Sequence, residues 1–346
     1  MREKILVGGY TKRESKGIYS FDLDIAKEEL SNLTEVAHIQ NATYFALDKA
    51  KQHLYTCAAD ENGGGIAALS YKRGKTEFLN YVTSVGAPLC YVAVDNDRGF
   101  VYGANYHLGE IRVYKIQKNG SLTLTDTVKH EGEGSKVHPG QERPHVHYTD
   151  LTPDGRLVTC DLGTDEITVY DVVGEEGKLS LVSLYRMPAG TGVRHLTFHP
   201  NGKIAYAIGE FSSTVTVLSY NEEKGRFAAL ETISTLPVDF EGTKSASALR
   251  LSSDGAFLYA SNRGHNSIAI YSVSPLGTKI TLEDIVKTEG DTPRDFNFNS
   301  TEDFIIVAHQ DSDNISLFRR NRKTGMLTLK QKDFYSPEGT CILPTL

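Results

Sequence analysis

The chain has 346 residues, yet it contains no tryptophan and only four cysteines. Cys57, Cys90, Cys160 and Cys341 form no CxxC pair, so their spacing predicts reduced thiols in strands, without a zinc site or a disulfide framework. No apolar stretch is long enough to span a membrane, and the run after Lys4 is too short for a signal peptide. We therefore expect a cytoplasmic protein without a membrane partner.

Several functional classes lack their signatures. The formal net charge of −7 argues against a general nucleic-acid binder, which would carry a basic face. There is no GxSxG, no P-loop and no dinucleotide fingerprint, so serine-hydrolase, NTPase and nicotinamide chemistry have no support. The negative net charge does not exclude a small anionic substrate, because a few converging arginines can make the electrostatic potential positive at the site itself.

One hairpin type recurs along the chain. Each copy has an apolar start, a turn rich in Asp, Asn, Gly or Pro, and an alternating apolar strand. The starts are separated by 47, 57, 47, 53 and 47 residues. They lie at Leu47, Val94, Leu151, Phe198, Leu251 and Phe298.

A second alternating strand follows each hairpin and occurs seven times, starting at Gly17, Gly65, Glu110, Glu166, Thr214, Ser267 and Asn314. A polar turn and a more polar fourth strand come next. Seven repeats of four strands predict an all-β, seven-bladed propeller with four-stranded blades, as a single domain over 1–346. The missing WD dipeptide argues against the WD40 type. Residues 339–344 are expected to close the ring as the innermost strand of the blade begun by residues 4–35.

In such blades, the loops into the innermost strand and out of the second strand share one end of the ring. Ionisable residues that gather there form the default site hypothesis. The long polar connection over 129–143 also belongs to this end, and long loops on a site face are often functional. The residues that this sorting collects are His145, Arg194, His195, Glu210, Arg263, Arg294, His309 and Glu338.

The segments GGYT, ANYHLGEIRVY, RPHVH, GVRHLTFHPNGKIAYAIGE and SNRG resemble the lactonase family of seven-bladed propellers over essentially the whole chain. That family includes propeller-type 6-phosphogluconolactonases and carboxymuconate-lactonising enzymes. The resemblance implies a metal-free site that opens or closes a lactone, with His145, Arg194, Glu210 and Arg263 as its key residues. Ala248 departs from the family pattern, because many members carry Asp or Glu there.

Lactone hydrolysis needs an activated water, a partner for the oxyanion and a proton for the leaving oxygen. His145 suits the acid or base role, and Glu210 could orient it or act as the base. Arg194 and Arg263 could hold an oxyanion, carboxylate or phosphate, although Arg194 and Glu210 could also form a structural ion pair. Candidates for substrate contact are His195, Arg294, Arg143, Asn262 and Glu338.

Two further expectations concern neighbouring histidines. His195 should point away from Arg194, because side chains alternate along a strand. His145 and His147 share one strand face, which leaves a metal site with Glu210 as an alternative to packed or hydrogen-bonded histidines.

The leading hypothesis is a metal-independent lactonase without a cofactor that hydrolyses an anionic sugar lactone, with 6-phosphogluconolactone of the pentose phosphate pathway as the best single candidate. A muconate-type cycloisomerase and a non-enzymatic propeller that binds a metabolite or protein remain as alternatives. The sequence predicts no oligomeric state.

Overall fold

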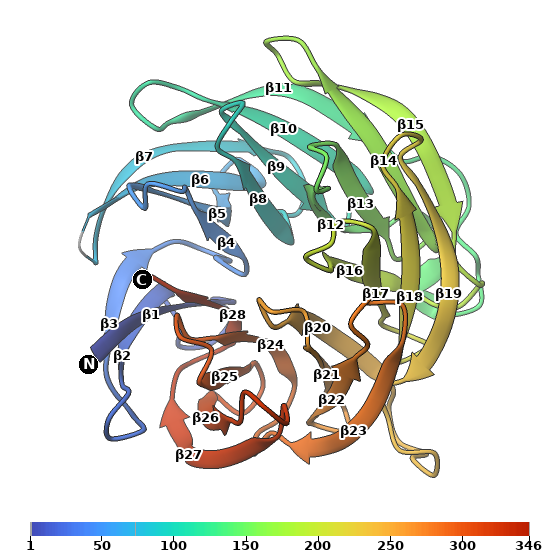
Figure 1. The fold of residues 1–346 in the computed structure, drawn as a ribbon. Helices are drawn as coiled ribbons and strands as arrows, with labels where there is room; N and C mark the ends of the chain where they lie inside the picture. Colours follow the sequence, from blue (N-terminus) through green and yellow to red (C-terminus); the bar gives the residue numbers. More distant parts are fainter. Residues whose placement is uncertain (1, 73, 346) are drawn as a thin grey trace. The chain divides into compact units, whose positions relative to one another are not determined.

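The computed structural model describes residues 2–72 and 74–345, which form seven four-stranded antiparallel sheets, the blades of a β-propeller (Figure 1). This confirms the predicted fold class. The only helical element of the described residues is the short 3-10 turn η1 (Pro139–Gln141), within the long connection. No helix in this part of the chain has the length and apolar character needed to cross a membrane.

The chain divides into two compact units. The first comprises Met1–His38, Thr197–Leu218 and Ala229–Leu346, and the second comprises Ile39–Leu196 and Ser219–Ala228. One sheet contributes residues to both units. Its strands, in spatial order, are β16 (Val193–Phe198), β17 (Ile204–Gly209), β18 (Thr214–Asn221) and β19 (Arg226–Ser234).

Three blades lie wholly in the first unit, and each is listed in its spatial order. One blade contains β28 (Gly339–Pro344), β1 (Arg2–Gly9), β2 (Gly17–Asp24) and β3 (Glu29–His38). The next contains β20 (Ser245–Leu251), β21 (Phe257–Arg263), β22 (Ser267–Val273) and β23 (Ile280–Lys287). The third contains β24 (Pro293–Phe298), β25 (Phe304–His309), β26 (Asn314–Arg320) and β27 (Leu327–Tyr335).

The second unit holds the other three complete blades. They contain β4 (Phe45–Leu47), β5 (His53–Asp60), β6 (Gly63–Lys72) and β7 (Lys75–Ser84); then β8 (Tyr91–Asp95), β9 (Phe100–Asn105), β10 (Glu110–Ile116) and β11 (Leu122–Lys129); and finally β12 (Val146–Leu151), β13 (Leu157–Asp161), β14 (Glu166–Val173) and β15 (Lys178–Arg186).

The C-terminal strand completes the N-terminal blade, as the sequence predicts. β28 pairs antiparallel with β1, with Val7 opposite Ile342, and Figure 1 shows the red strand beside the blue one. The register shifts at Gly9, where a Cβ atom would lie 2.3 Å from the Glu338 carbonyl oxygen. Only glycine permits this close approach, which brings the start of the β1–β2 loop against the residue before β28.

Apolar side chains that alternate with polar ones along the strands form the core. Inward-facing side chains of β1, β2, β25, β26 and β28 form one buried cluster that includes Ile5, Phe21, Ile306 and Ile342. A repeated sheet buries both faces only against its neighbours, so these clusters lie between adjacent blades. The outermost strands remain half exposed, which explains their more polar sequences.

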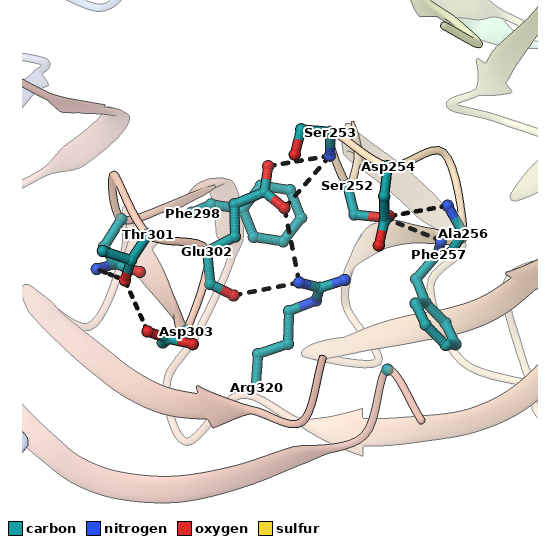
Figure 2. A network of polar contacts seen from close by, with 12 residues as sticks. Ser252, Ser253, Asp254, Ala256, Phe257, Phe298, Thr301, Glu302, Asp303 and Arg320 are labelled. Atoms are coloured by element: carbon teal, nitrogen blue, oxygen red, sulfur yellow. Dashed lines mark hydrogen bonds and ion pairs between the residues drawn. The ribbon is translucent and has the colours of Figure 1, made fainter. Parts of the chain in front are cut away.

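Polar contacts also join neighbouring blades at the end that carries the Asp-Gly turns (Figure 2). The buried Arg320 of β26 donates to the Tyr259 hydroxyl of β21 and to the Glu302 carbonyl in the β24–β25 turn. The Glu302 carboxylate in turn accepts the backbone N–H of Ser253. This network joins the β20–β23 blade to the β24–β27 blade near the C-terminal end of β24, whereas Arg294 lies near the other end of that strand.

Candidate functional site

His145 immediately precedes β12 in the second unit and is only 3% exposed. Its backbone N–H donates to Asp161 Oδ1 at 2.8 Å, and its ring stacks on the Tyr106 ring with centroids 4.2 Å apart. Its Nδ1 lies 2.9 Å from the Tyr106 carbonyl oxygen. Backbone, ring plane and ring rotation are therefore all fixed by neighbouring groups.

Both ring nitrogens of His145 lie beside oxygen atoms of neighbouring residues. Nδ1 faces a carbonyl oxygen, which only accepts, so this nitrogen carries a hydrogen. Nε2 lies 3.1 Å from Glu142 Oε1, which is also an acceptor when ionised. The hydrogen bond from its own backbone N–H lowers the pKa of Glu142 below its usual range, burial opposes this, and hydrogen bonds from Arg143 and His145 lower the pKa further. The ring of His145 is therefore held between the Tyr106 backbone carbonyl and the Glu142 carboxylate.

Asp161, at the end of β13, organises the surroundings of His145. Its Oδ1 accepts backbone N–H groups from His145, Gly163 and Thr164, and the side chain is fully buried. Its Oδ2 lies 2.7 Å from Nδ1 of His130, at the start of the long connection. The carboxylate thus ties this loop to the backbone that positions His145.

The remaining histidines of this region lie among tyrosines. The His147 and His195 rings are 5.2 Å apart, and Tyr91 meets His195 edge-on at 5.2 Å. The expectation that His195 points away from Arg194 is wrong, because Arg194 Nη1 lies 3.1 Å from His195 Nε2. The flexible arginine stem brings its guanidinium back towards the next residue. Since a guanidinium only donates, Nε2 of His195 is the acceptor of this hydrogen bond.

In the first unit, Glu210 follows β17 and Arg263 ends β21. Arg263 Nη2 lies 2.8 Å from Glu210 Oε2, and each side chain is 15% exposed. The Ala246 backbone joins them, because its N–H donates to the Glu210 carbonyl and its carbonyl accepts from Arg263. The Nε of Arg263 is buried and has no hydrogen-bond acceptor among the described residues.

Two residues near Arg263 are buried and make their contacts within the blades. Asn262 is fully buried, and its amide bonds to the Thr235 carbonyl and hydroxyl and to Ser267, so we leave it out of the proposed site. Ala248 lies in an apolar cluster with Ile268 and Phe296, and no charge is accommodated there.

The other predicted contacts have clear placements. Arg143 is half exposed and donates to Glu142, which places it beside His145. Arg294, in β24, is partly buried and donates to Gln310. Glu338 is buried, and its carboxylate accepts the backbone N–H groups of the β1–β2 loop. Its role in substrate contact stays a prediction, as does that of Arg143.

The metal alternative finds no ligand set in the described residues, where no three His, Cys, Asp or Glu side chains are grouped suitably. His145, moreover, uses both ring nitrogens in hydrogen bonds to Tyr106 and Glu142. All four cysteines are free thiols.

Sequence reasoning missed Glu142, Asp161 and His130 as site residues. Asp161 could have been found from its place at a second-strand exit on the site face. Glu142 and His130 lie in the long connection, whose irregular backbone gives no periodic signal. Only the folded loop shows that one contacts His145 directly and the other contacts it through Asp161.

Comparison with known proteins identifies the family whose members this chain resembles over nearly its full length. A family model described as "Lactonase, 7-bladed beta-propeller" matches residues 4–344. The 6-phosphogluconolactonase of Bacillus subtilis is 38% identical over 340 residues, covering 97% of this chain and 96% of that protein.

Two solved structures share the fold over nearly the full length. A Lactobacillus plantarum protein has a TM-score of 0.96 at 46% identity, with 99% of both chains covered. The periplasmic gluconolactonase PpgL of Pseudomonas aeruginosa has a TM-score of 0.93 at 28% identity, with 99% of both chains covered.

Proposed function

The chain belongs to the lactonase family of seven-bladed β-propellers, and from this premise we propose that it hydrolyses 6-phosphogluconolactone to 6-phosphogluconate without a metal. The observation that carries the proposal is Arg263. Its Nη2 is held by Glu210, while its buried Nε lacks an acceptor within the described chain. An unsatisfied buried donor costs about 1–3 kcal/mol, and an oxyanion of the substrate would satisfy it.

The reaction assigns a role to each residue. Glu210 takes a proton from water as the oxygen of that water bonds to the lactone carbonyl carbon. Arg263 stabilises the negative oxygen of the tetrahedral adduct. The bond to the ring oxygen then breaks, and the carboxylic acid of Glu210 returns its proton to that oxygen. The products are a carboxylic acid, which ionises, and a free hydroxyl group. The catalytic roles expected of His145 and Arg194, in the second unit, stay predictions.

The test is the rate of hydrolysis of freshly generated 6-phosphogluconolactone, with and without EDTA, against the spontaneous rate. We expect a large acceleration that EDTA leaves unchanged. Arg263→Gln should lower kcat by about 10²–10³-fold, as removal of an oxyanion donor does. Glu210→Gln should lower it by about 10²–10⁴-fold, as loss of a general base does.

A matched control is Arg186→Gln, because Arg186 is 77% exposed and only pairs with Glu166 at the surface. Its activity should equal that of the wild type. No acceleration by the wild type would reject this substrate, and full activity of both site variants would reject the assigned residues.

A further inference from the structure

Two cations flank one tyrosine ring in the first unit. Lys12 Nζ lies 4.2 Å from the centroid of the Tyr10 ring, and Arg294 Cζ lies 5.5 Å from it. Tyr10 and Arg294 are partly buried, and Lys12 is exposed. Cation–π contact holds both charges against a common ring, from which Lys12 Nζ and the guanidinium N–H groups of Arg294 that do not bind Gln310 can donate to an anion.

The loop that carries Lys12 is rigidly held. The buried Glu338 accepts the N–H of Lys12 at 3.0 Å, of Arg13 at 2.9 Å and of Ser15 at 3.2 Å. A carboxylate that holds three backbone donors fixes the loop before any ligand arrives, which lowers the entropy lost on binding.

Arg294 is oriented as well, and it adjoins the site of the proposed reaction. Its Nη1 donates to Gln310 Oε1 at 3.1 Å, and its carbonyl accepts from Ser247 at 2.7 Å. Ser247 directly follows Ala246, whose carbonyl accepts from Arg263. Arg263 and Arg294 therefore lie on neighbouring blades linked through two consecutive residues of β20.

The nearby carboxylates already have other partners. Asp313 pairs with Arg13 at 2.7 Å, and Asp311 accepts from Thr292 and Gln310. Glu338 is occupied by the loop amides. Among the described residues, neither Lys12 nor Arg294 forms an ion pair, so both charges lack an anionic partner.

We propose that Tyr10, Lys12 and Arg294 form a subsite for the phosphate group of a phosphorylated sugar lactone. This inference rests on the proposed function, and it assigns the choice between a phosphorylated and an unphosphorylated lactone to these residues. The phosphate ester and the lactone carbonyl are separate groups of the substrate. A second cationic site beside Arg263 is what such a molecule requires, and guanidinium and ammonium groups are the usual phosphate partners.

The experiment compares kcat/KM for 6-phosphogluconolactone and glucono-1,5-lactone in the wild type, Lys12→Met, Arg294→Gln and the double variant. Each single change should lower kcat/KM for the phosphorylated lactone by about tenfold, as expected for one charge-assisted contact, and the double variant by more. Values for the unphosphorylated lactone should stay within about twofold. Lys16→Met is the matched control, since Lys16 is an exposed lysine of the same loop whose backbone N–H donates to the Tyr19 hydroxyl.

Equal losses on both lactones, or no loss on either while Arg263→Gln is inactive, would overturn the subsite and leave the proposed function standing. If the wild type accelerates neither reaction, the proposed function fails, and calorimetric titration with 6-phosphogluconate and gluconate decides the subsite. Preferential binding of 6-phosphogluconate that the double variant loses would support it, and equal or absent binding would overturn it. Unchanged melting temperatures confirm that the variants are folded.

Discussion

Three histidines of this protein show how local partners set the chemistry of a residue. His145 lies between two oxygen acceptors, whereas Nε2 of His195 accepts from the Arg194 guanidinium. His309, at the end of β25, is fully buried and donates to the Asn314 carbonyl. The same side chain therefore meets acceptors at one position, a donor at the next and the blade core at the third.

His309 gives a prediction about stability and pH. Burial lowers its pKa from 6.5 to about 4, so the unfolded chain binds a proton that the folded chain refuses between these values. The free energy of unfolding should therefore fall as pH drops from about 6.5 to 4, by up to about 3 kcal/mol from this residue. In His309→Gln, whose amide can still donate to Asn314, this part of the loss should disappear in urea titrations at pH 7, 5.5 and 4.5.

The control for this titration is His38→Gln, because the His38 side chain is 66% exposed. Its unfolding curves should follow those of the wild type at each pH. An equally steep loss of stability in His309→Gln and the wild type would show that His309 does not contribute to acid sensitivity.

The sequence predicts the positions of some individual site residues but not of others. Arg263 and Glu210 were placed on one face by strand order, and they form an ion pair. Asn262 lies in the same strand-exit segment as Arg263 and was predicted to contact the substrate. Because side chains alternate along the strand, the Asn262 side chain points into the blade interior instead. Glu142 could not be predicted, since its contact with His145 depends on the path of an irregular loop.

At the scale of elements, the long connection over 129–143 is an ordered part of the site region. The buried side-chain amide of Gln141 donates to the Leu162 carbonyl, and His130 contacts Asp161 and the Tyr170 hydroxyl. Both ends are therefore fixed to the β12–β15 blade. Its composition alone was equally compatible with a loose surface insertion, because Gly-rich polar segments do not reveal their tertiary partners.

The contact between the β20–β23 and β24–β27 blades depends on a buried arginine (Figure 2). Arg320 lies over the rings of Phe257, Tyr259 and Phe298 and is 2% exposed. Arg320→Met should lower the free energy of unfolding by about 3–5 kcal/mol, because it leaves the polar partners of a buried charge unpaired. Chemical denaturation measures this loss, and lactonase activity at low temperature should persist.

The adjacent residue provides the control. Arg319 is 47% exposed and pairs with Glu28 at the surface, so Arg319→Met should cost less than about 1 kcal/mol. Similar costs for the two variants would contradict a special role for the buried network, and loss of activity in folded Arg320→Met would place this end of the blades in the mechanism.

For the whole molecule, the sequence was most informative. Repetition at intervals near 47 residues predicted blade number, strand number and the pairing of the C-terminal strand with the first blade. These features follow from a local pattern repeated many times, so an error in one repeat is corrected by the others. Catalytic groups occur once each, and no repetition supports their assignment.

Closure of the first blade by β28 should therefore be essential for folding. Ending the chain at Glu338 removes Ile342, which is 1% exposed, and leaves β1 without its partner strand. The truncation would expose Ile5 and Val7, which are buried in the complete chain, beside an unpaired strand edge. Such an edge invites aggregation, so we expect no monomeric folded product in size-exclusion chromatography. A graded version is Ile342→Ala, which should cost about 2–5 kcal/mol in denaturation, against less than about 0.5 kcal/mol for Leu329→Ala on exposed β27. A shortened chain that melts cooperatively at the wild-type temperature would show that the remaining blades are stable without this strand.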